Sequence, residues 1–201
     1  MSAREEPGID TIAVVFEQPE RLALTRLTLA EPCADDVVVD ICWSGISTGT
    51  ERLLWTGRMP AFPGMGYPLV PGYESVGRVA KAGPLSGRSI GDRVFVPGAK
   101  CFGDVRGLFG GAAAHVVLPG LRTIPFAEHL AEQGVLLALA ATAYHAHSTA
   151  GLKQPDSYPR TGVSQFCYDR LTLADVQELV PDLFKLAQSE GLADRMWGAP
   201  A

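Results

Sequence analysis

The sequence lacks several features that mark common functional classes. It contains no Asn, and its four cysteines, Cys33, Cys42, Cys101 and Cys167, form no closely spaced pair. A C-x-x-C zinc lobe or an iron–sulfur site therefore has no ligand set here. The 17 basic residues are scattered and are outnumbered by 22 acidic ones, which leaves a net charge of −5. This balance argues against nucleic acid as a partner.

Long apolar runs are also missing. The longest, residues 135–144, is about half of the roughly 20 residues that a membrane-spanning helix needs. The first ten residues are polar and acidic, without the basic and then apolar order of a secretory signal. Because there is no disulfide pattern either, we expect a cytoplasmic, reduced protein without a transmembrane segment.

Glycine and proline, in contrast, are abundant, with 22 and 15 of 201 residues. Such a chain is rich in turns and favours short strands over helix bundles. Six apolar and β-branched runs, each bounded by turn residues, predict strands at 11–16, 22–29, 37–42, 75–80, 93–96 and 113–118. Six short strands of this kind indicate a mainly β domain, built as a small, partly closed barrel.

Two parts of this barrel carry a further prediction. The run 22–29 alternates apolar with polar or small residues after a turn at 18–20, which predicts a hairpin with one solvated face. The run 37–42 is almost continuously apolar, as in a strand that is buried on both faces.

The segment between the third and fourth strands has an unusual composition. Thr50 and Glu51 precede an apolar run, which is typical of a short helical turn with an N-cap. Residues 58–72 contain four prolines and three glycines and are expected to be irregular. Apolar side chains here either pin the loop to the barrel or cover a flat, apolar substrate. The candidates for substrate binding are Trp55, Phe62, Met65 and Tyr67.

A short motif in the same region is typical of another class of enzyme. Residues 45–49 read GISTG, which fits the G-x-S-x-G nucleophile elbow of α/β-hydrolases. The elbow needs a parallel sheet of strand–helix–strand units, whereas only hairpin-like strands precede Gly45. No acid is placed convincingly before His145 or His147 to complete a triad. We therefore do not expect a hydrolase.

Longer motifs carry a resemblance to a different family. SGISTGTE at the end of a strand, PLVPGYESVG and GDRVFVP resemble the GroES-like catalytic domain of medium-chain dehydrogenases. In that superfamily a Cys after the third strand and the His of a G-H-E triplet bind catalytic zinc. Ser47 and Tyr73 hold these positions here. Because a serine hydroxyl and a phenol are poor zinc ligands, the resemblance implies a site without zinc or another metal.

A more specific resemblance covers most of the chain. WSGISTGTERLLWTGRMPAFPGMGYPLVPGYESVGRV, GDRVFVPGAKCFGDVRGLFGGAAAHVVLP and GVLLALAATAYHA are similar to the 3-hydroxyethyl bacteriochlorophyllide a dehydrogenases of phototrophic bacteria. The similarity runs from about Thr11 to Ala146, roughly 70% of the chain. It implies an oxidoreductase of bacteriochlorophyll a synthesis that oxidises a hydroxyethyl group to acetyl with NAD⁺. The implied partner is a bacteriochlorophyllide-type tetrapyrrole, for which residues 58–72 would form a wall.

Without zinc, side chains must accept the proton of the substrate alcohol. The resemblance makes Ser47 or Thr48 the group that hydrogen-bonds the hydroxyl and relays its proton. Tyr73 is the next candidate, because it stands at a zinc-ligand position, and Glu74 is the fourth candidate catalytic residue. Three of them have structural alternatives. Ser47 would satisfy turn amides, Tyr73 would be a core aromatic residue, and Glu74 would hold the loop through backbone N–H groups.

The superfamily places its nucleotide-binding domain directly after the TAYHA segment. Thr142 and His145 are therefore the candidate cofactor contacts. However, no G-x-G-x-x-G motif occurs, and residues 147–201 are too few for a doubly wound sheet of roughly 120–150 residues. We expect a GroES-like domain at 1–132, a connecting helix at 133–147 and a divergent tail with amphipathic helices at 148–201.

Two interpretations of this organisation stay open. The chain is either a truncated dehydrogenase with an unrelated tail or a shortened paralogue that keeps the tetrapyrrole-facing half. In the first case, the apolar helix at 135–144 loses its partner domain, and the tail or a second copy in a homo-oligomer would cover it. In the second case, the chain would be a non-catalytic chlorin-binding or protein-interaction module.

Overall fold

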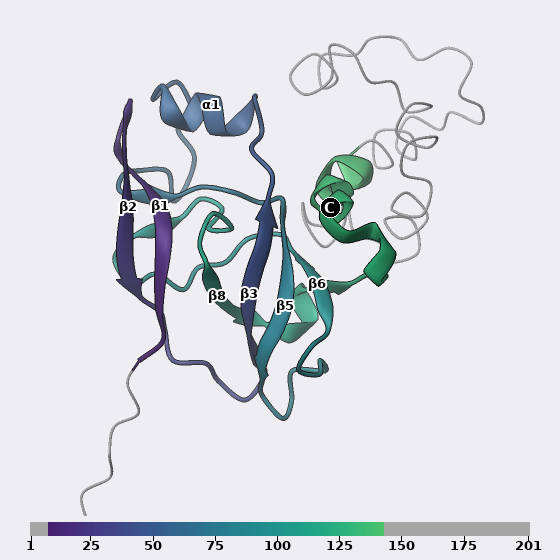
Figure 1. The fold of residues 1–201 in the computed structure, drawn as a ribbon. Helices are drawn as coiled ribbons and strands as arrows, with labels where there is room; N and C mark the ends of the chain where they lie inside the picture. Colours follow the sequence, from purple (N-terminus) through teal and green to yellow (C-terminus); the bar gives the residue numbers. More distant parts are fainter. Residues whose placement is uncertain (1–7, 143–201) are drawn as a thin grey trace, which may run out of the picture.

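The computed structural model describes residues 8–142, which form two β-sheets with short helices at their ends (Figure 1). One sheet has the strand order β2-β1-β4-β7 and the other the order β8-β3-β5-β6-β9. The strands are β1 (Asp10–Gln18), β2 (Arg21–Thr28), β3 (Asp36–Ser44), β4 (Leu69–Val70), β5 (Ser75–Ala82), β6 (Arg93–Val96), β7 (Arg106–Gly107), β8 (His115–Pro119) and β9 (Ile124–Pro125). The helices are α1 (Thr50–Trp55) and the 3₁₀ segments η1 (Gly120–Arg122) and η2 (Glu128–Leu136).

All six predicted strands are present, as β1, β2, β3, β5, β6 and β8. The sequence does not predict β4, β7 and β9, because two residues are too few to show a pattern. Strand β4 lies within residues 58–72, so the expectation that this segment is wholly irregular is wrong. Leu69 and Val70 are fully buried, and Leu69 pairs with Phe16 of β1. Burial against β1 therefore orders the end of the loop as a strand.

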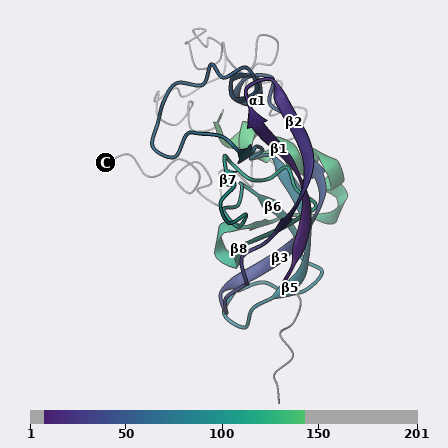
Figure 2. The same ribbon diagram turned by 90° about the vertical axis from the view of Figure 1, so that its left-hand side faces the viewer.

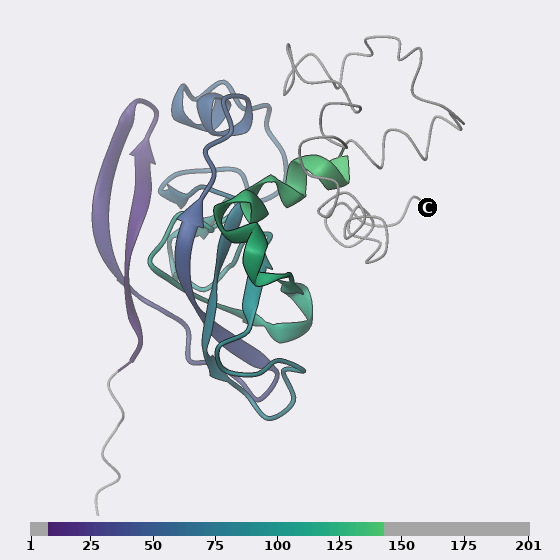
Figure 3. The same cartoon turned by 45° about the vertical axis from the view of Figure 1, so that its right-hand side comes forward.

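A short extended segment joins the two sheets. The Val14 N–H donates to the Ala112 carbonyl at 2.9 Å, and the Ala114 N–H donates to the Ile12 carbonyl at 2.8 Å. On its other side, the Ala114 carbonyl accepts the Ile41 N–H at 2.9 Å. The segment thus bonds to β1 and to β3, and this junction confirms the predicted partly closed barrel. Figures 1 and 3 show the β1–β2 hairpin set apart from β3, and Figure 2 shows α1 beside the upper end of this hairpin.

Strand β3 is buried in the core between the sheets over only part of its length. Val37, Val38 and Val39 are buried, but Asp40 and Cys42 are exposed. The prediction that the run 37–42 is buried on both faces is therefore wrong for its second half. Ladder pairing with β8 ends at Asp40 and is followed by the single bond from the Ile41 N–H to the Ala114 carbonyl, after which β5 is the paired strand.

The last described residues close one side of the barrel. Residues 133–136 belong to η2, and helical turns follow at 137–142. Buried apolar residues of these turns pack with residues of β5 and β6 in one cluster: Leu137, Ala138, Ala140, Ala141, Tyr73, Val76 and Phe95. The described part of the connecting helix is thus covered by the barrel itself. No helix within residues 8–142 is long and apolar enough to cross a membrane.

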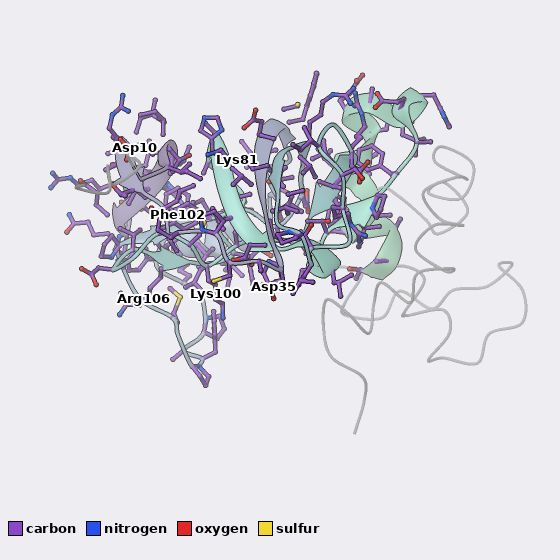
Figure 4. All side chains as sticks on the ribbon, turned by 90° about the horizontal axis from the view of Figure 1, so that it is seen from below. Asp10, Asp35, Lys81, Lys100, Phe102 and Arg106 are labelled. Carbon is purple, nitrogen blue, oxygen red and sulfur yellow. The ribbon has the colours of Figure 1, made fainter. Side chains whose placement is uncertain are left out.

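The two ends of the barrel differ in character. The end far from α1 carries charged side chains, including Asp10, Asp35, Lys81 and Lys100 (Figure 4). The end at α1 carries the residues that the sequence singled out for chemistry.

Candidate active site

Antiparallel pairing of β3 with β5 brings the two predicted site segments together. Ser44, the last residue of β3, pairs with Ser75, the first of β5, and their Oγ atoms lie 3.0 Å apart. The chain segments beyond them run side by side, and the Gly45 N–H donates to the Glu74 carbonyl at 2.7 Å. A Cβ on Gly45 would lie 2.5 Å from Glu74 Oε2, so this close approach requires glycine. The segments that carry the family resemblance therefore form one site.

Ser47 organises the start of α1. Its Oγ accepts the N–H of Gly49 at 3.3 Å and that of Thr50 at 3.1 Å, while its own N–H donates to Glu51 Oε2 at 3.1 Å. The structural alternative for Ser47, satisfying turn amides, is thus present. The residue at the N-cap position, Gly49, makes no side-chain cap bond, and the Thr50 hydroxyl lies 3.3 Å from the Tyr73 hydroxyl. Ser47 therefore satisfies the first amides of the helix.

Five side chains form a polar group, here named the carboxyl cluster: Ser47 and Thr50, which are half-buried, and Glu51, Tyr73 and Glu74, which are buried. Tyr73 is central: its hydroxyl lies 3.3 Å from the Thr50 hydroxyl, and Ser47, Glu51 and Glu74 are all close enough to influence the pKa of its phenol. Glu51 and Glu74 are only 6% and 4% exposed, and the Oε1 atom of each has no hydrogen-bond partner. Buried polar atoms are normally paired. Two unpaired carboxyl oxygens in one cluster therefore mark a costly arrangement.

The environment of the cluster shifts three pKa values. Burial, and after it the charge of Glu51, raise the pKa of Glu74 to about 7. Burial also raises the pKa of Glu51, although hydrogen bonds from its own backbone and from Ser47 oppose the rise. Burial raises the pKa of the Tyr73 phenol, so this group stays protonated at neutral pH. A carboxyl that titrates near neutral pH suits general-base chemistry.

The carboxyl cluster borders an open cavity of about 830 Å³, a size typical of ligand sites. One wall is the face of α1 and the turn before it, where Thr48, Glu51, Arg52 and Trp55 follow helical spacing. The remaining lining residues come from the two sheets and the segments between them: Ile12, Val14, Phe16, Leu22, Leu24, Ser44, Gly45, Ile46, Ser47, Pro71, Gly72, Ala112, Ala113 and Ala114. Apolar side chains dominate this set.

The opposite wall is the apolar face of the β1–β2 hairpin. Leu22 pairs with Phe16 and Leu24 with Val14, so the four side chains share one face. Leu24 is 73% exposed, whereas its neighbour Ala23 is half-buried. The strand has one exposed face, as predicted, and Leu22 and Leu24 lie on that exposed face. Alternation shows which residues share a face, but not which face meets the core.

The four predicted substrate-binding residues occupy different places. Trp55 lines the cavity. Met65 and Tyr67 pack with Leu54 of α1, and the Tyr67 hydroxyl donates to the Leu54 carbonyl. Phe62 is partly exposed and lies outside the lining of the cavity. The contacts of Met65 and Tyr67 thus correspond to the alternative in which the loop is pinned to the barrel.

The two predicted cofactor contacts remain predictions. The Thr142 hydroxyl donates to the Ala138 carbonyl at 2.9 Å, one helical turn earlier. His145 lies outside the described residues.

The surroundings of β3 exclude the nucleophile elbow. β3 pairs antiparallel with both β5 and β8, whereas the elbow belongs to a parallel sheet. The imidazole of His115 on β8 lies 2.7 Å from the Asp40 carboxyl, from Nδ1 to Oδ1. Ser47 therefore lacks the setting of a hydrolase nucleophile.

The carboxyl cluster falls within a known domain family. Residues 33–128 match the alcohol dehydrogenase GroES-like domain. The chain contains an alcohol dehydrogenase GroES-like domain. A short chain alcohol dehydrogenase from Escherichia coli, complexed with NADH, superposes with a TM-score of 0.63 at 19% identity, over 92% of this chain and 61% of that one. A cobalt and zinc bound alcohol dehydrogenase from Pyrobaculum aerophilum gives 0.57 at 24%, over 72% and 50%. At these identities the likeness shows the fold alone.

Two relatives extend the similarity beyond this GroES-like domain. The chain is 49% identical over 169 residues to the 2-desacetyl-2-hydroxyethyl bacteriochlorophyllide A dehydrogenase of Cereibacter sphaeroides, which covers 82% of this chain and 53% of the relative. The protein of the same name from Rhodobacter capsulatus is 48% identical over 167 residues, covering 83% and 53%. The predicted resemblance is confirmed. The chain spans about half the length of these curated relatives.

Some dehydrogenases with this fold bind zinc, so the carboxyl cluster must be compared with a zinc site. Ser47 Oγ already accepts two amide hydrogens, and the raised pKa of Tyr73 keeps the phenol neutral. Neutral hydroxyls are weak zinc ligands. Between residues 8 and 142 no group of three or more His, Cys, Asp and Glu side chains is placed to hold a metal. The donor set of the cluster therefore does not fit a catalytic zinc.

Proposed function

We propose that the chain acts in the oxidation of the hydroxyethyl group of a bacteriochlorophyllide-type tetrapyrrole to acetyl, with NAD⁺ as hydride acceptor. The observation that carries the proposal is the position of the carboxyl cluster beside the apolar cavity. The cavity suits a flat, apolar ring, and the cluster offers a proton acceptor at its edge. The printed names of the two relatives support the class of substrate.

Oxidation of a secondary alcohol removes a hydride from the carbinol carbon and a proton from the oxygen. NAD⁺, when bound, supplies the hydride acceptor. Thr48, or Ser47 after one of its two amide hydrogen bonds is broken, accepts the hydrogen bond of the substrate hydroxyl and relays its proton; both residues line the cavity. The Glu74 carboxylate is the final proton acceptor in this proposal, and Tyr73, whose pKa is influenced by both Ser47 and Glu74, is the group through which the proton would pass. A pKa of about 7 leaves Glu74 partly ionised at neutral pH and able to receive it.

In this proposal the described residues bind the tetrapyrrole substrate and accept its proton. Between residues 8 and 142 no glycine-rich turn leads from a strand into a helix in the manner of a dinucleotide site. A bound NAD⁺ would therefore be held mainly by residues outside this range.

The test separates binding from turnover. We expect 3-hydroxyethyl bacteriochlorophyllide a to quench tryptophan fluorescence and to raise the Tm of the chain, because Trp55 lines the cavity. With NAD⁺ present, the product should be the acetyl compound, detected by mass spectrometry as the loss of two hydrogen atoms and matched by NADH absorbance. If this chlorin does not bind, the proposal is wrong.

A serine variant tests the relay. Ser47→Ala should lower kcat by about a hundredfold while changing the Kd of the chlorin less than twofold. The exposed Ser89→Ala is the matched control and should leave both unchanged. Ser47→Thr keeps the hydroxyl and should restore activity. An unchanged kcat in Ser47→Ala would move the role to Thr48 or Tyr73.

A second candidate function is a non-catalytic chlorin-binding module. The apolar cavity favours it, because binding of a flat ring there requires no chemical step. Calorimetric titration with NAD⁺ separates the two functions. Heat of binding supports the dehydrogenase, whereas chlorin binding with neither NAD⁺ heat nor turnover supports the module.

A further inference from the structure

Arg52 is the one positively charged residue among the described residues that line the cavity. It lies on α1, on the same face as Thr48 and Trp55, and its side chain is exposed. The other charged lining residue, Glu51, is buried and accepts the N–H of Ser47. The cavity therefore presents an apolar surface with one cation at its edge.

The Arg52 guanidinium has no hydrogen-bond or ion-pair partner within residues 8–142. Several other arginines of the barrel are paired, unlike Arg52. Arg78 and Arg93 bond to Glu128, and Arg88 bonds to the hydroxyl and carbonyl of Thr123. An unpaired guanidinium at the edge of an apolar cavity is free to pair with an anionic group of a ligand.

We propose that Arg52 binds a carboxylate of the ligand in the cavity and thereby selects tetrapyrroles with a free acid side chain over their esters. The planar guanidinium offers two parallel N–H groups that match the two oxygens of a carboxylate. The apolar faces of the hairpin and of Trp55 hold the ring, and its acid group reaches the rim at Arg52. This inference rests on the proposed function and names the form of tetrapyrrole that the site takes.

The test compares two probes that share one ring. Pheophorbide a carries one free propionate, and its methyl ester carries none. We expect the chain to bind the free acid about fivefold more tightly than the ester, as for an ion pair at a solvated rim. Arg52→Gln should remove this preference. The variant should bind the free acid more weakly, while the Kd of the ester stays within twofold of its value for the unmodified chain. Tryptophan fluorescence and the visible absorbance of the ring both report the Kd.

A matched control removes the same charge nearby. Arg58 is exposed, lies just beyond α1 and does not line the cavity. Arg58→Gln should keep the preference for the acid, and raising the salt concentration should reduce it in both this variant and the unmodified chain. Equal Kd values for acid and ester, or a preference that survives in Arg52→Gln, would overturn the inference while leaving the proposed function intact. Failure of both probes to bind would contradict the proposed function itself.

Discussion

Two polar groups of the barrel differ in the burial and in the hydrogen-bond pairing of their acidic side chains. The carboxyl cluster contains two buried acids of like charge and leaves the Oε1 atoms of Glu51 and Glu74 without partners. The second group, here named the arginine group, consists of Arg78, Arg93 and Glu128 at the surface. Arg78 binds both oxygens of Glu128, at 2.8 and 2.7 Å, and Arg93 binds one of them at 3.0 Å.

The pKa values show the same contrast. Burial raises the pKa of Glu74 to about 7, whereas hydrogen bonds from Arg78 lower the pKa of Glu128. The arginine group therefore favours the charged form of its acid, and the carboxyl cluster opposes it. Strongly shifted pKa values are common at functional sites, and Ser47 and Glu51 of this cluster line the cavity. The arginine group links β5, β6 and η2 at the surface through ion pairs, which is a structural role.

The largest effect on the carboxyl cluster should come from weakening the packing of α1, the helix that carries Glu51. Leu54 is 1% exposed and packs with Phe16, Leu69 and Leu108. Leu54→Ala should lower the free energy of unfolding by about 3 kcal/mol, because it removes buried methyl groups and leaves a cavity. Urea unfolding measures this loss, and the Kd of pheophorbide a should rise with it.

The matched control for this variant is a leucine at the surface. Leu85 is 72% exposed, and Leu85→Ala should change the free energy of unfolding by less than about 0.5 kcal/mol. If Leu54→Ala is destabilised but its Kd for pheophorbide a is unchanged, the cavity does not depend on the packing of α1 against the barrel.

An effect no larger than that of Leu54→Ala should follow from pH. The folded pKa of Glu74, about 7, lies above its ordinary value of 4.5. The folded state therefore binds this proton more tightly than the unfolded state, so the contribution of Glu74 is complete below pH 4.5 and is lost as the pH rises to 7. Stability should fall by up to about 3 kcal/mol across this window, at about 1.4 kcal/mol for each pKa unit. Unfolding curves at several pH values measure the loss.

Glu74→Gln should flatten that dependence, because an amide carries no charge at any of these pH values. At pH 8 the variant should be at least as stable as the unmodified chain. A slope that persists between pH 4.5 and 7 in Glu74→Gln would assign the titration to another group, with Glu51 as the first candidate, since burial raises its pKa too.

Sequence patterns predict the strands well but not the buried site residues. Apolar runs bounded by turns locate all six longer strands, because each pattern is local. The burial of Glu51 cannot be predicted from such local patterns. An acid in the first turn of a helix normally faces solvent, and Glu51 is buried only because β3–β5 pairing places Tyr73 and Glu74 against it. The family resemblance finds Ser47, Tyr73 and Glu74, whose positions match its motifs, and it includes Glu51 as the last residue of SGISTGTE without giving it a role.

The smallest effect should come from the arginine group. The lowered pKa of Glu128 means that its contribution is present above pH 4.5 and is lost as the pH falls through that value, opposite in sign to Glu74. Its side chain is exposed, so solvent and salt screen the pairs with Arg78 and Arg93. Glu128→Gln should therefore lower the Tm slightly at low salt and pH 7, and not at all in 1 M salt. If it instead destabilises the chain as strongly as Leu54→Ala, the arginine group is a main support of the fold and the contrast with the carboxyl cluster fails.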